Sequence, residues 1–593
     1  MTSIGQEPLL APLARVPVRR PRRSSVPAAP GHLAIAGLLY LFFGILLIWP
    51  IVQIVRTGFT RPDGSFTLAY LKLIFRDPVL VRGLLNAAAV AVLVTALTLV
   101  LALPLAVLSV RYTFPGRSLL NGLLLVPLVL PPFVGAIGMR MVLGRYGPLT
   151  RIVGGGPLGI DWIGKYRLLG VVVIEALHLY PVMLLNLQAA LANLDPAMEQ
   201  AAANLGAGRW TIFRRVTLPM IRPGLFAGCT LVLIWSFTEL GTPLMFNFFT
   251  ITPVQVFEQI TEVAGNPLPY ALVVVMLLAS AVLYLFGKVL LGRRFDAATT
   301  KASIAAAPRP LRGWKGTGAL SLFAIVFLLA VVPHASVVLT SFSATGAWYK
   351  SILPAKFTLD HYRQALTDPL AIPSVKHSLQ YASCATALAL VIGLAAAVII
   401  VRSNVPGRGV IDALAMLPLA VPGLVLSFGY LSISIWFKRK LGSKTPFFLD
   451  VQEWPAVMLV VAYAARRLPY VVRAAAAGLQ QTPRDLELAA ANLGASRWRV
   501  LARITLPLIL ANLIAGALLA FAFAMLEVSD SIILAQRIDY YPITKAILDL
   551  SQRLGDGLYI ASALGVWAMI LLTLTILAAN ALLGKKIGAV FKM

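Results

Sequence analysis

One stretch of about twenty residues occurs twice in this chain, as EQAAANLGAGRWTIFRRVTLP at Glu199–Pro219 and as ELAAANLGASRWRVLARITLP at Glu487–Pro507. The copies lie 288 positions apart, and most of their aligned positions are identical. A second match begins at Arg111 and at Arg402, each of which is followed four residues later by Pro-Gly-Arg. Repetition at a nearly fixed offset marks a duplicated structural unit. The duplication therefore covers both halves of the chain in the same order.

The composition is that of a membrane protein. The 593 residues are 59% hydrophobic and only 12% charged, with a mean hydropathy of +0.84, whereas soluble domains are about one-quarter charged. Apolar runs of about 20 residues are long enough to cross a bilayer as helices. They predict twelve spans, near residues 33–55, 84–110, 118–142, 168–190, 223–244, 270–291, 318–340, 379–401, 410–436, 455–478, 511–535 and 559–583.

The spans divide into two units of six. Residues 1–30 are expected to form a basic cytoplasmic tail, 31–291 the first unit, 292–317 a cytoplasmic linker and 318–593 the second unit. An even number of spans per unit makes the two copies enter the membrane from the same side, related by an axis along the membrane normal. The predicted fold is an all-α membrane protein with two parallel six-helix repeats. Kinks are expected in the third spans, at Pro127, Pro131, Pro132, Pro418 and Pro422.

The net charge of +28 would suggest nucleic-acid binding in a soluble protein. Here most basic residues separate apolar runs, so the charge is better explained by orientation in the membrane, with both termini cytoplasmic. Cys229 and Cys384 lie in apolar segments of different halves. This placement argues against a disulfide scaffold or a thiolate metal site, and no metal ligand is predicted.

The duplicated segment lies between the fourth and fifth spans of each half and is predicted to be cytoplasmic. An Ala-rich run forms a short helix, begun by Asp195 as N-cap in one copy and by Thr482, with Asp485, in the other. Gly206 and Gly494 are placed to end it. Small Ala side chains suit insertion into a groove of another protein. An interfacial helix that only lies on the membrane is the alternative.

These residues resemble the EAA loop of type I ABC importer permeases, which has Glu-Ala-Ala, three residues, Gly, and then Leu-Pro ending thirteen residues after that Gly. The resemblance extends through the repeat to essentially the whole chain. It implies a permease in a bacterial inner membrane, served by an extracytoplasmic solute-binding protein and a cytoplasmic ATPase dimer. The coupling residues that it implies are Glu199, Ala201, Ala202, Gly206, Arg209, Pro219, Glu487, Ala489, Ala490, Gly494, Arg497 and Pro507.

The acidic position departs from the family pattern. The family usually has Glu six residues before the Gly, where this chain has Gln200 and Leu488, and the glutamates Glu199 and Glu487 stand one position earlier. One residue is about 100° around a helix. Whether these glutamates pair with the ATPase therefore stays open.

The chain is expected to be a transport subunit and not an enzyme. It contains no G-x-x-x-x-G-K-[ST] phosphate loop, and it shows no nucleophile, base and orienter arrangement. ATP and Mg²⁺ are therefore expected on the partner ATPase, with no cofactor in this chain.

Carboxylates also recur inside the predicted membrane region. Glu239 and Glu527 lie 288 positions apart, about fifteen residues into the fifth spans, and Asp530 follows one turn later. Charged groups at such depth face a cavity or a partner. The three residues are candidates for the solute path or a gate, and a structural role is the alternative.

Fusion of both units in one chain resembles the permease group for ferric iron, with thiamine, polyamine and aminoethylphosphonate permeases as near relatives. Ferric iron is the predicted substrate, and the other three solutes are alternatives of the same class. An ion-driven secondary transporter with 6+6 parallel repeats is the alternative of another class. That alternative leaves the twin cytoplasmic loops unexplained.

Overall fold

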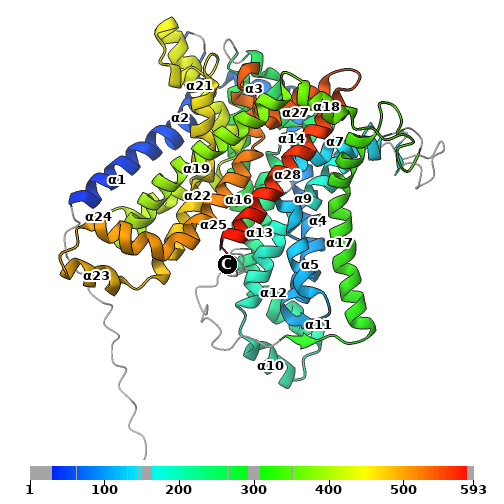
Figure 1. The fold of residues 1–593 in the computed structure, drawn as a ribbon, viewed down its shortest axis with the longest axis vertical. Coiled ribbons are helices and arrows are strands. Elements are labelled where there is room, and N and C mark those ends of the chain that lie inside the picture. The colour runs from blue at the N-terminus through cyan, green and yellow to red at the C-terminus, as the bar shows by residue number, and fades with distance from the viewer. Residues whose placement is uncertain are drawn as a thin grey trace, which may run out of the picture.

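The computed structural model describes residues 30–61, 63–129, 131–144, 147–148, 163–164, 166–262, 266–291, 308–348 and 351–583 (Figure 1). The predicted tail, apart from residue 30, and the linker up to residue 307 lie outside these ranges. Within them, regular structure is helical except for two short parallel strands, β1 (Tyr112–Thr113) and β2 (Arg309–Pro310).

The spans follow the predicted pattern. Among the described residues, ten helices are long and apolar enough to cross a membrane, and twelve if two bent pairs each count as one span. The all-α membrane fold is therefore confirmed. The first unit comprises α1 (Pro30–Phe43) with α2 (Trp49–Gly58), α4 (Pro78–Arg111), α5 (Arg117–Leu123) with α6 (Val126–Val129) and α7 (Pro132–Leu143), α9 (Arg167–Ala192), α13 (Arg222–Phe237) and α16 (Leu268–Leu291). The second comprises α17 (Trp314–Phe342), α19 (Ala371–Arg402), α20 (Arg408–Ala420) with α21 (Gly423–Leu441), α22 (Pro455–Gln481), α25 (Leu506–Met525) and α28 (Gly557–Leu583).

Each third span bends sharply at a proline. The axis turns by 89° in the first unit and by 102° in the second. Pro132 begins α7, and Pro422 is the N-cap of α21. Proline cannot donate the backbone hydrogen bond that would continue the preceding helix, so these breaks agree with the predicted kinks. Pro127 and Pro418 lie within α6 and α20 instead and do not mark the bends.

The fifth spans are interrupted, contrary to the prediction of continuous helices. In the first unit α13 ends at Phe237 and α14 (Gly241–Met245) follows, and in the second α25 ends at Met525 and α26 (Ser529–Leu534) follows. Non-helical backbone at membrane depth is tolerated only where protein surrounds it or it lines a cavity. The breaks therefore need local polar partners, which the glutamates provide.

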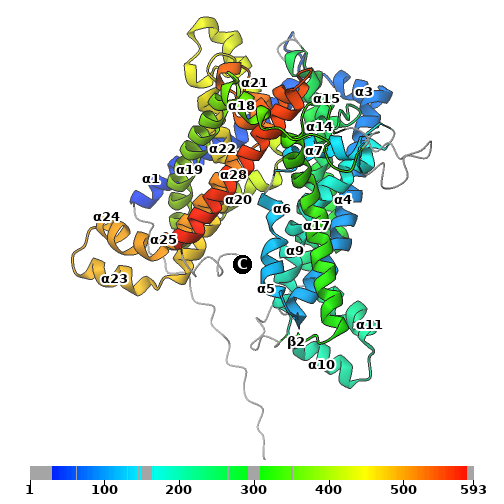
Figure 2. The same cartoon turned by 45° about the vertical axis from the view of Figure 1, so that its right-hand side comes forward.

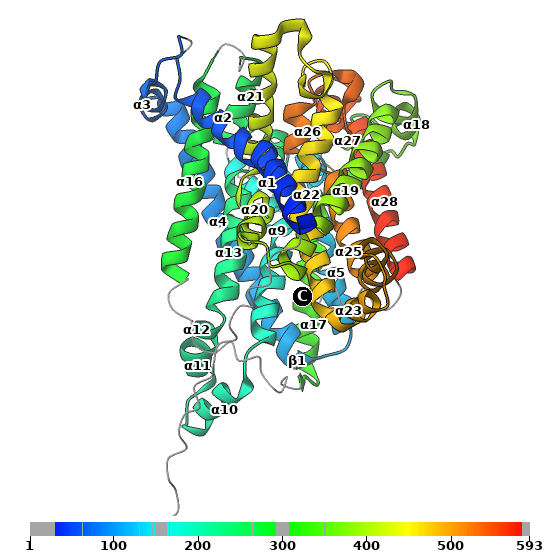
Figure 3. The ribbon, with the colours of Figure 1, turned by 90° about the vertical axis from the view of Figure 1, so that its left-hand side faces the viewer.

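The first helix of each unit packs against the other unit. α17 lies along α7 (Figure 2), and α2 lies along α21 (Figure 3). Gly138 and Gly429 form the two crossings. A Cβ atom at Gly138 would lie 2.3 Å from the backbone nitrogen of Val337, and one at Gly429 would lie 2.6 Å from Cβ of Pro50. Only glycine permits this close approach, and it does so at equivalent positions of the repeat.

Replacing Gly138 by alanine is expected to destabilise the fold by about 1–3 kcal/mol, the usual penalty for overpacking, because backbone atoms of α17 cannot move aside independently. Thermal unfolding of the purified permease in detergent measures the effect. Gly318→Ala is the matched control. Gly318 lies on α17, and no atom lies within 4 Å of a Cβ built there. Equal melting temperatures for the two variants would contradict the close crossing.

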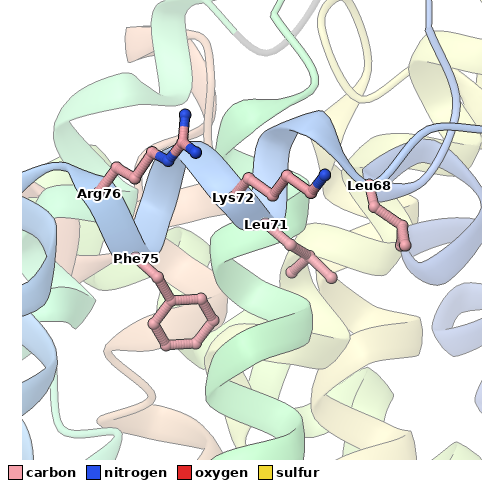
Figure 4. A pocket seen from close by; sticks show the side chains of 5 residues that line it. All are labelled: Leu68, Leu71, Lys72, Phe75 and Arg76. Atoms are coloured by element: carbon pink, nitrogen blue, oxygen red, sulfur yellow. The ribbon is translucent and has the colours of Figure 1, made fainter.

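A short amphipathic helix precedes the second span of each unit. In the first unit this helix is α3 (Ala69–Arg76). A surface pocket is lined by four of its side chains and by the residue before it, namely Leu71, Lys72, Phe75, Arg76 and Leu68 (Figure 4). Apolar side chains next to basic ones are typical of a helix at a membrane surface. Its counterpart in the second unit, α18 (Asp360–Thr367), is more polar and packs on α28.

Candidate coupling loops and central charged cluster

The duplicated segment forms two matching loops. The first contains α10 (Pro196–Asn204) and α11 (Arg209–Ile212), and the second contains α23 (Arg484–Asn492) and α24 (Arg497–Val500). Figures 1 and 2 show the two loops protruding from the helical body and standing apart from each other. We call them the first and second coupling loops.

Glycine ends the short helix of each coupling loop, as predicted. Gly206 has φ +81° and Gly494 has φ +83°, values in the left-handed region that favours glycine. In the second loop the amide of Gly494 donates to the carbonyl of Ala491 (3.0 Å), and that of Ala495 donates to Ala490 (3.0 Å). The first loop has the equivalent pair of bonds. This is the Schellman pattern, which satisfies the last carbonyls of the helix.

The helix starts differ between the loops. Asp195 is the N-cap of α10, and its carboxylate accepts the amide of Ala197 at 2.9 Å, as predicted. The prediction for the second loop is wrong, because the N-cap position is Pro483. The hydroxyl of Thr482 donates back to the carbonyl of Gly478 at 3.0 Å. Thr482 thus closes the end of α22 instead of starting α23.

Exposure follows the same pattern in both loops. Ala201 and Ala489 are exposed, whereas Ala202 and Ala490 are half-buried. At equivalent positions both loops expose an arginine and three large apolar side chains. The arginines are Arg209 and Arg497, and the apolar residues are Met198, Leu205 and Trp210 in the first loop and Leu486, Leu493 and Trp498 in the second. The second loop also exposes Leu488.

The loop glutamates face their own chain. Glu199 forms an ion pair with Arg111, the last residue of α4. Glu487 pairs with Arg402, the last residue of α19, with 3.2 Å between Oε1 and Nε. All four side chains are partly buried. The positions where the family usually has Glu, Gln200 and Leu488, are exposed instead.

A threonine completes each ion pair. The hydroxyl of Thr217 donates to Glu199, and that of Thr505 donates to Glu487 Oε1 at 3.2 Å. Each threonine ends a π-helical turn, η2 (Phe213–Thr217) or η6 (Leu501–Thr505). Pro219 and Pro507 follow two residues later. Because proline lacks an N–H and its ring clashes with the carbonyl four residues earlier, a widened turn at this point is expected.

Glu527 lies in a buried charged cluster of the second unit, at the break in the fifth span. Its side chain is 4% exposed and accepts Arg466 Nη1 at Oε1 (2.6 Å) and also pairs with Arg467. Both arginines belong to α22. Its backbone carbonyl accepts the hydroxyl of Thr544 at 2.8 Å. Glu527 therefore joins the broken fifth span to the fourth span.

Asp530 extends the cluster to the bend of the third span. Arg466 Nη1 lies 3.7 Å from Asp530 Oδ2, and the hydroxyl of Ser427 on α21 donates to Asp530. A Cβ at Gly423, the first residue of α21, would lie 1.9 Å from Arg466 Nη1. The guanidinium thus occupies the space beside Gly423 and holds the bend against α22.

Glu239 has a different environment in the first unit. Its Oε1 accepts the amides of Gly241 (3.1 Å) and Thr242 (3.4 Å), which are free donors at the start of α14. Glu239 also interacts electrostatically with Arg466 of the other unit and with buried Glu175 of α9. The two equivalent glutamates therefore both stabilise a break, one by capping a helix and one by pairing with arginines.

Arg466, Arg467 and Glu175 were missed by sequence reasoning, although ionisable residues within apolar spans are a recognised signal of buried function. Arg111 and Arg402 were noticed only as part of the repeat. Within the described residues, no group of three or more His, Cys, Asp or Glu side chains could hold a metal ion.

Proteins of similar sequence include three bacterial transport permeases. A provisionally named ferric transport system permease protein of Haemophilus influenzae is 28% identical over 84% of this chain and 76% of its own length. A ferric transport system permease protein of Actinobacillus pleuropneumoniae is 27% identical over 88% and 73%. The molybdenum transport system permease protein of Escherichia coli K12 is 36% identical over 26% of this chain and 67% of its own.

A solved bacterial ABC transporter involved in the import of the acidic polysaccharide alginate is also similar, with 17% identity, a TM-score of 0.36, and coverage of 44% of this chain and 96% of that chain. The family model for the binding-protein-dependent transport system inner membrane component matches twice, at residues 98–297 and 389–588. The two matches cover more than half of the chain and one falls in each unit. The chain therefore belongs to the family of binding-protein-dependent transport system inner membrane components, as a fusion of two permease units.

Proposed function

We propose that this chain forms the solute path of an ATP-driven importer in a bacterial inner membrane and that its two coupling loops dock on a cytoplasmic ATPase dimer. The observation that carries the proposal is the duplicated exposed surface of the loops. Leu205 is 88% exposed and Leu493 is 89% exposed, and these two residues occupy equivalent positions. Exposed apolar groups that cluster on a polar protrusion mark a protein interface.

The rest of the exposed surface supports a common partner. Trp210 and Trp498 are 70% and 75% exposed, and Met198 and Leu486 are 54% and 47% exposed. Three apolar residues thus recur with the same spacing, next to the exposed Ala201 or Ala489. A membrane-surface helix would need only an apolar face. Two copies of one residue pattern suit two copies of one ATPase subunit, on which ATP and Mg²⁺ would be bound.

The orientation follows from this assignment. The start of α1 lies by the second coupling loop, where His32 interacts electrostatically with Arg484 and Arg497. The start of α17 lies by β1, at the inner end of α4. If the coupling loops are cytoplasmic, both units begin on the cytoplasmic side, which is the parallel arrangement expected for two six-span units. An extracytoplasmic binding protein would then deliver the solute to the opposite end.

Ferric iron is the proposed substrate. Its support is the similarity to two proteins named for ferric transport, which extends over more than four-fifths of this chain. The shorter similarity to a molybdenum transport permease makes molybdate a second candidate. Thiamine, polyamine and aminoethylphosphonate remain alternatives of the same class.

The test is ATP hydrolysis by the complete transporter in lipid, with its binding protein loaded in turn with ferric iron, molybdate, thiamine, a polyamine or aminoethylphosphonate. We expect the ferric form to stimulate hydrolysis and to drive uptake into proteoliposomes. Stimulation by another loaded form would keep the importer and replace the substrate. Uptake that follows an ion gradient, without an associated ATPase, would support the secondary transporter instead.

A further inference from the structure

We infer that Glu199 and Glu487 act inside the permease, each holding a coupling helix to the inner end of the second span, so that a displaced coupling helix carries this span with it. We call Arg111, Glu199 and Thr217 the first latch, and Arg402, Glu487 and Thr505 the second latch. The inference rests on the proposed function and assigns these glutamates a partner other than the ATPase.

The second latch joins four elements. Arg402 ends α19, and its Nε donates to Glu487 Oε1 of α23 at 3.2 Å. Its Nη2 donates to the carbonyl of Thr482 at the end of α22 at 2.9 Å. Thr505, which ends η6, donates to the same Glu487 oxygen at 3.2 Å. One arginine and one carboxylate thus connect the second span, the fourth span, the coupling helix and the start of the fifth span.

The first latch has the same Arg–Glu–Thr set, which joins α4, α10 and η2. Arg111 ends α4 and pairs with Glu199 of α10. Its Nη2 lies 3.5 Å from the hydroxyl oxygen of Thr217, which itself donates to Glu199. The Arg–Glu–Thr set recurs in both units, although some neighbouring residues, such as Gln200 and Leu488, differ. The latch therefore belongs to the duplicated unit and is not a feature of one copy.

Partial burial makes the pairs effective. The side chains of Arg402 and Glu487 are 14% and 17% exposed, and those of Arg111 and Glu199 are 29% and 24% exposed. Water screens such pairs less than it screens ion pairs on an open surface. The second latch is the more enclosed of the two, so its removal is expected to have the larger effect.

The latches change how a coupling helix can transmit movement. Through the chain alone, α23 is connected to α22 before it and to α24 and α25 after it. The second latch adds a direct side-chain connection to α19, which packs along both α22 and α25. A displacement of α23 is then shared by three spans that move as one body. Without the latch, α23 can tilt on its two connections while α19 stays in place.

Glu487→Gln tests the inference in the complete transporter. We expect the amount of ⁵⁵Fe taken up per ATP hydrolysed, with ferric-loaded binding protein and proteoliposomes, to fall at least about fivefold, the lower end of ordinary coupling between sites. Asp485→Asn is the matched control, because it removes an exposed carboxylate of the same helix outside the latch. Exchange of the two charges, Arg402→Glu with Glu487→Arg, should restore part of the uptake per ATP hydrolysed. Arg402→Lys, which keeps the positive charge, should retain more uptake per ATP than Glu487→Gln does.

A second measurement does not depend on the substrate. Spin labels at Ala491 on α23 and Val391 on α19, in a background without Cys229 and Cys384, report the distance between the two helices. In the parent protein we expect a narrow distribution of distances between the labels that is the same with and without ATP and vanadate. In Glu487→Gln we expect a broader distribution that changes when nucleotide is added.

The inference is overturned if Glu487→Gln leaves both the uptake ratio and the distance distribution unchanged. It is also overturned if the charge exchange folds and restores nothing, which would place the partner of Glu487 outside the permease. Failure of the proposed function looks different, because the unmodified transporter would then show no ATP-driven uptake with any loaded binding protein.

Discussion

Replacing Glu527 by glutamine is expected to lower the free energy of unfolding by about 3–5 kcal/mol, the usual consequence of removing one partner from a buried ion pair. The carboxylate is 4% exposed and faces the guanidinium groups of Arg466 and Arg467. Glutamine offers one acceptor oxygen and no negative charge, so it can accept from only one of the two arginines and leaves the positive charge of both without this partner. Thermal unfolding of the purified transporter in lipid nanodiscs measures the change.

Glu239→Gln is the matched control at the equivalent position. The carboxylate of Glu239 accepts only the backbone amides of Gly241 and Thr242 among its recorded hydrogen bonds, and an amide oxygen can accept them as well. We expect this variant to unfold within about 1 kcal/mol of the parent, the size of an ordinary net hydrogen-bond contribution. Equal losses in both variants would contradict the different structural roles. Normal stability with lost uptake in both would place the two glutamates on the solute path.

Features of this chain that depend on residues close in the sequence were predictable, whereas features that depend on how the spans pack were not. The spans, the parallel repeat and the two coupling helices follow from apolar run length, from self-similarity and from local capping signals. These properties depend on neighbours in the chain. The positions of Gly206, Gly494 and Asp195 were therefore predictable, and the bends before α7 and α21 follow from prolines in the same way.

Side-chain partners depend on how spans pack, so the sequence could not determine them. Arg466 and Arg467 are adjacent in α22, yet both reach Glu527, 60 or more residues away in the chain. In the second unit no proline lies near the break in the fifth span, which is stabilised by the tertiary contacts of Glu527 with Arg466 and Arg467. In the first unit the break is stabilised locally, because Glu239 caps α14, and Pro243 lies within α14. Glu199 and Glu487 stand one residue before the position of the family's glutamate, which turns their side chains by about 100° around the helix axis. The family pattern alone therefore does not say which partner these side chains face.

Truncating the two most exposed leucines of the coupling loops, Leu205→Ala with Leu493→Ala, is expected to weaken binding of the ATPase subunits by roughly a hundredfold or more. Full burial of a leucine side chain contributes about 1.5–3 kcal/mol, and two such losses correspond to that factor or a larger one. The isolated permease should keep its stability within about 0.5 kcal/mol, because exposed side chains contribute little to folding. Titration of the purified ATPase onto the permease in nanodiscs measures the affinity.

The choice of control decides between a protein interface and a membrane surface. Leu510 is 51% exposed on the fifth span and lies beyond the second coupling loop, so Leu510→Ala should leave ATPase affinity unchanged. Because Leu205 and Leu493 are almost equally exposed, each single variant should lose about the same affinity. An ATPase that binds the double variant as tightly as the parent would remove the loops from the interface. Unequal single losses would instead show that the two ATPase subunits engage the permease differently, although the loops share one sequence pattern.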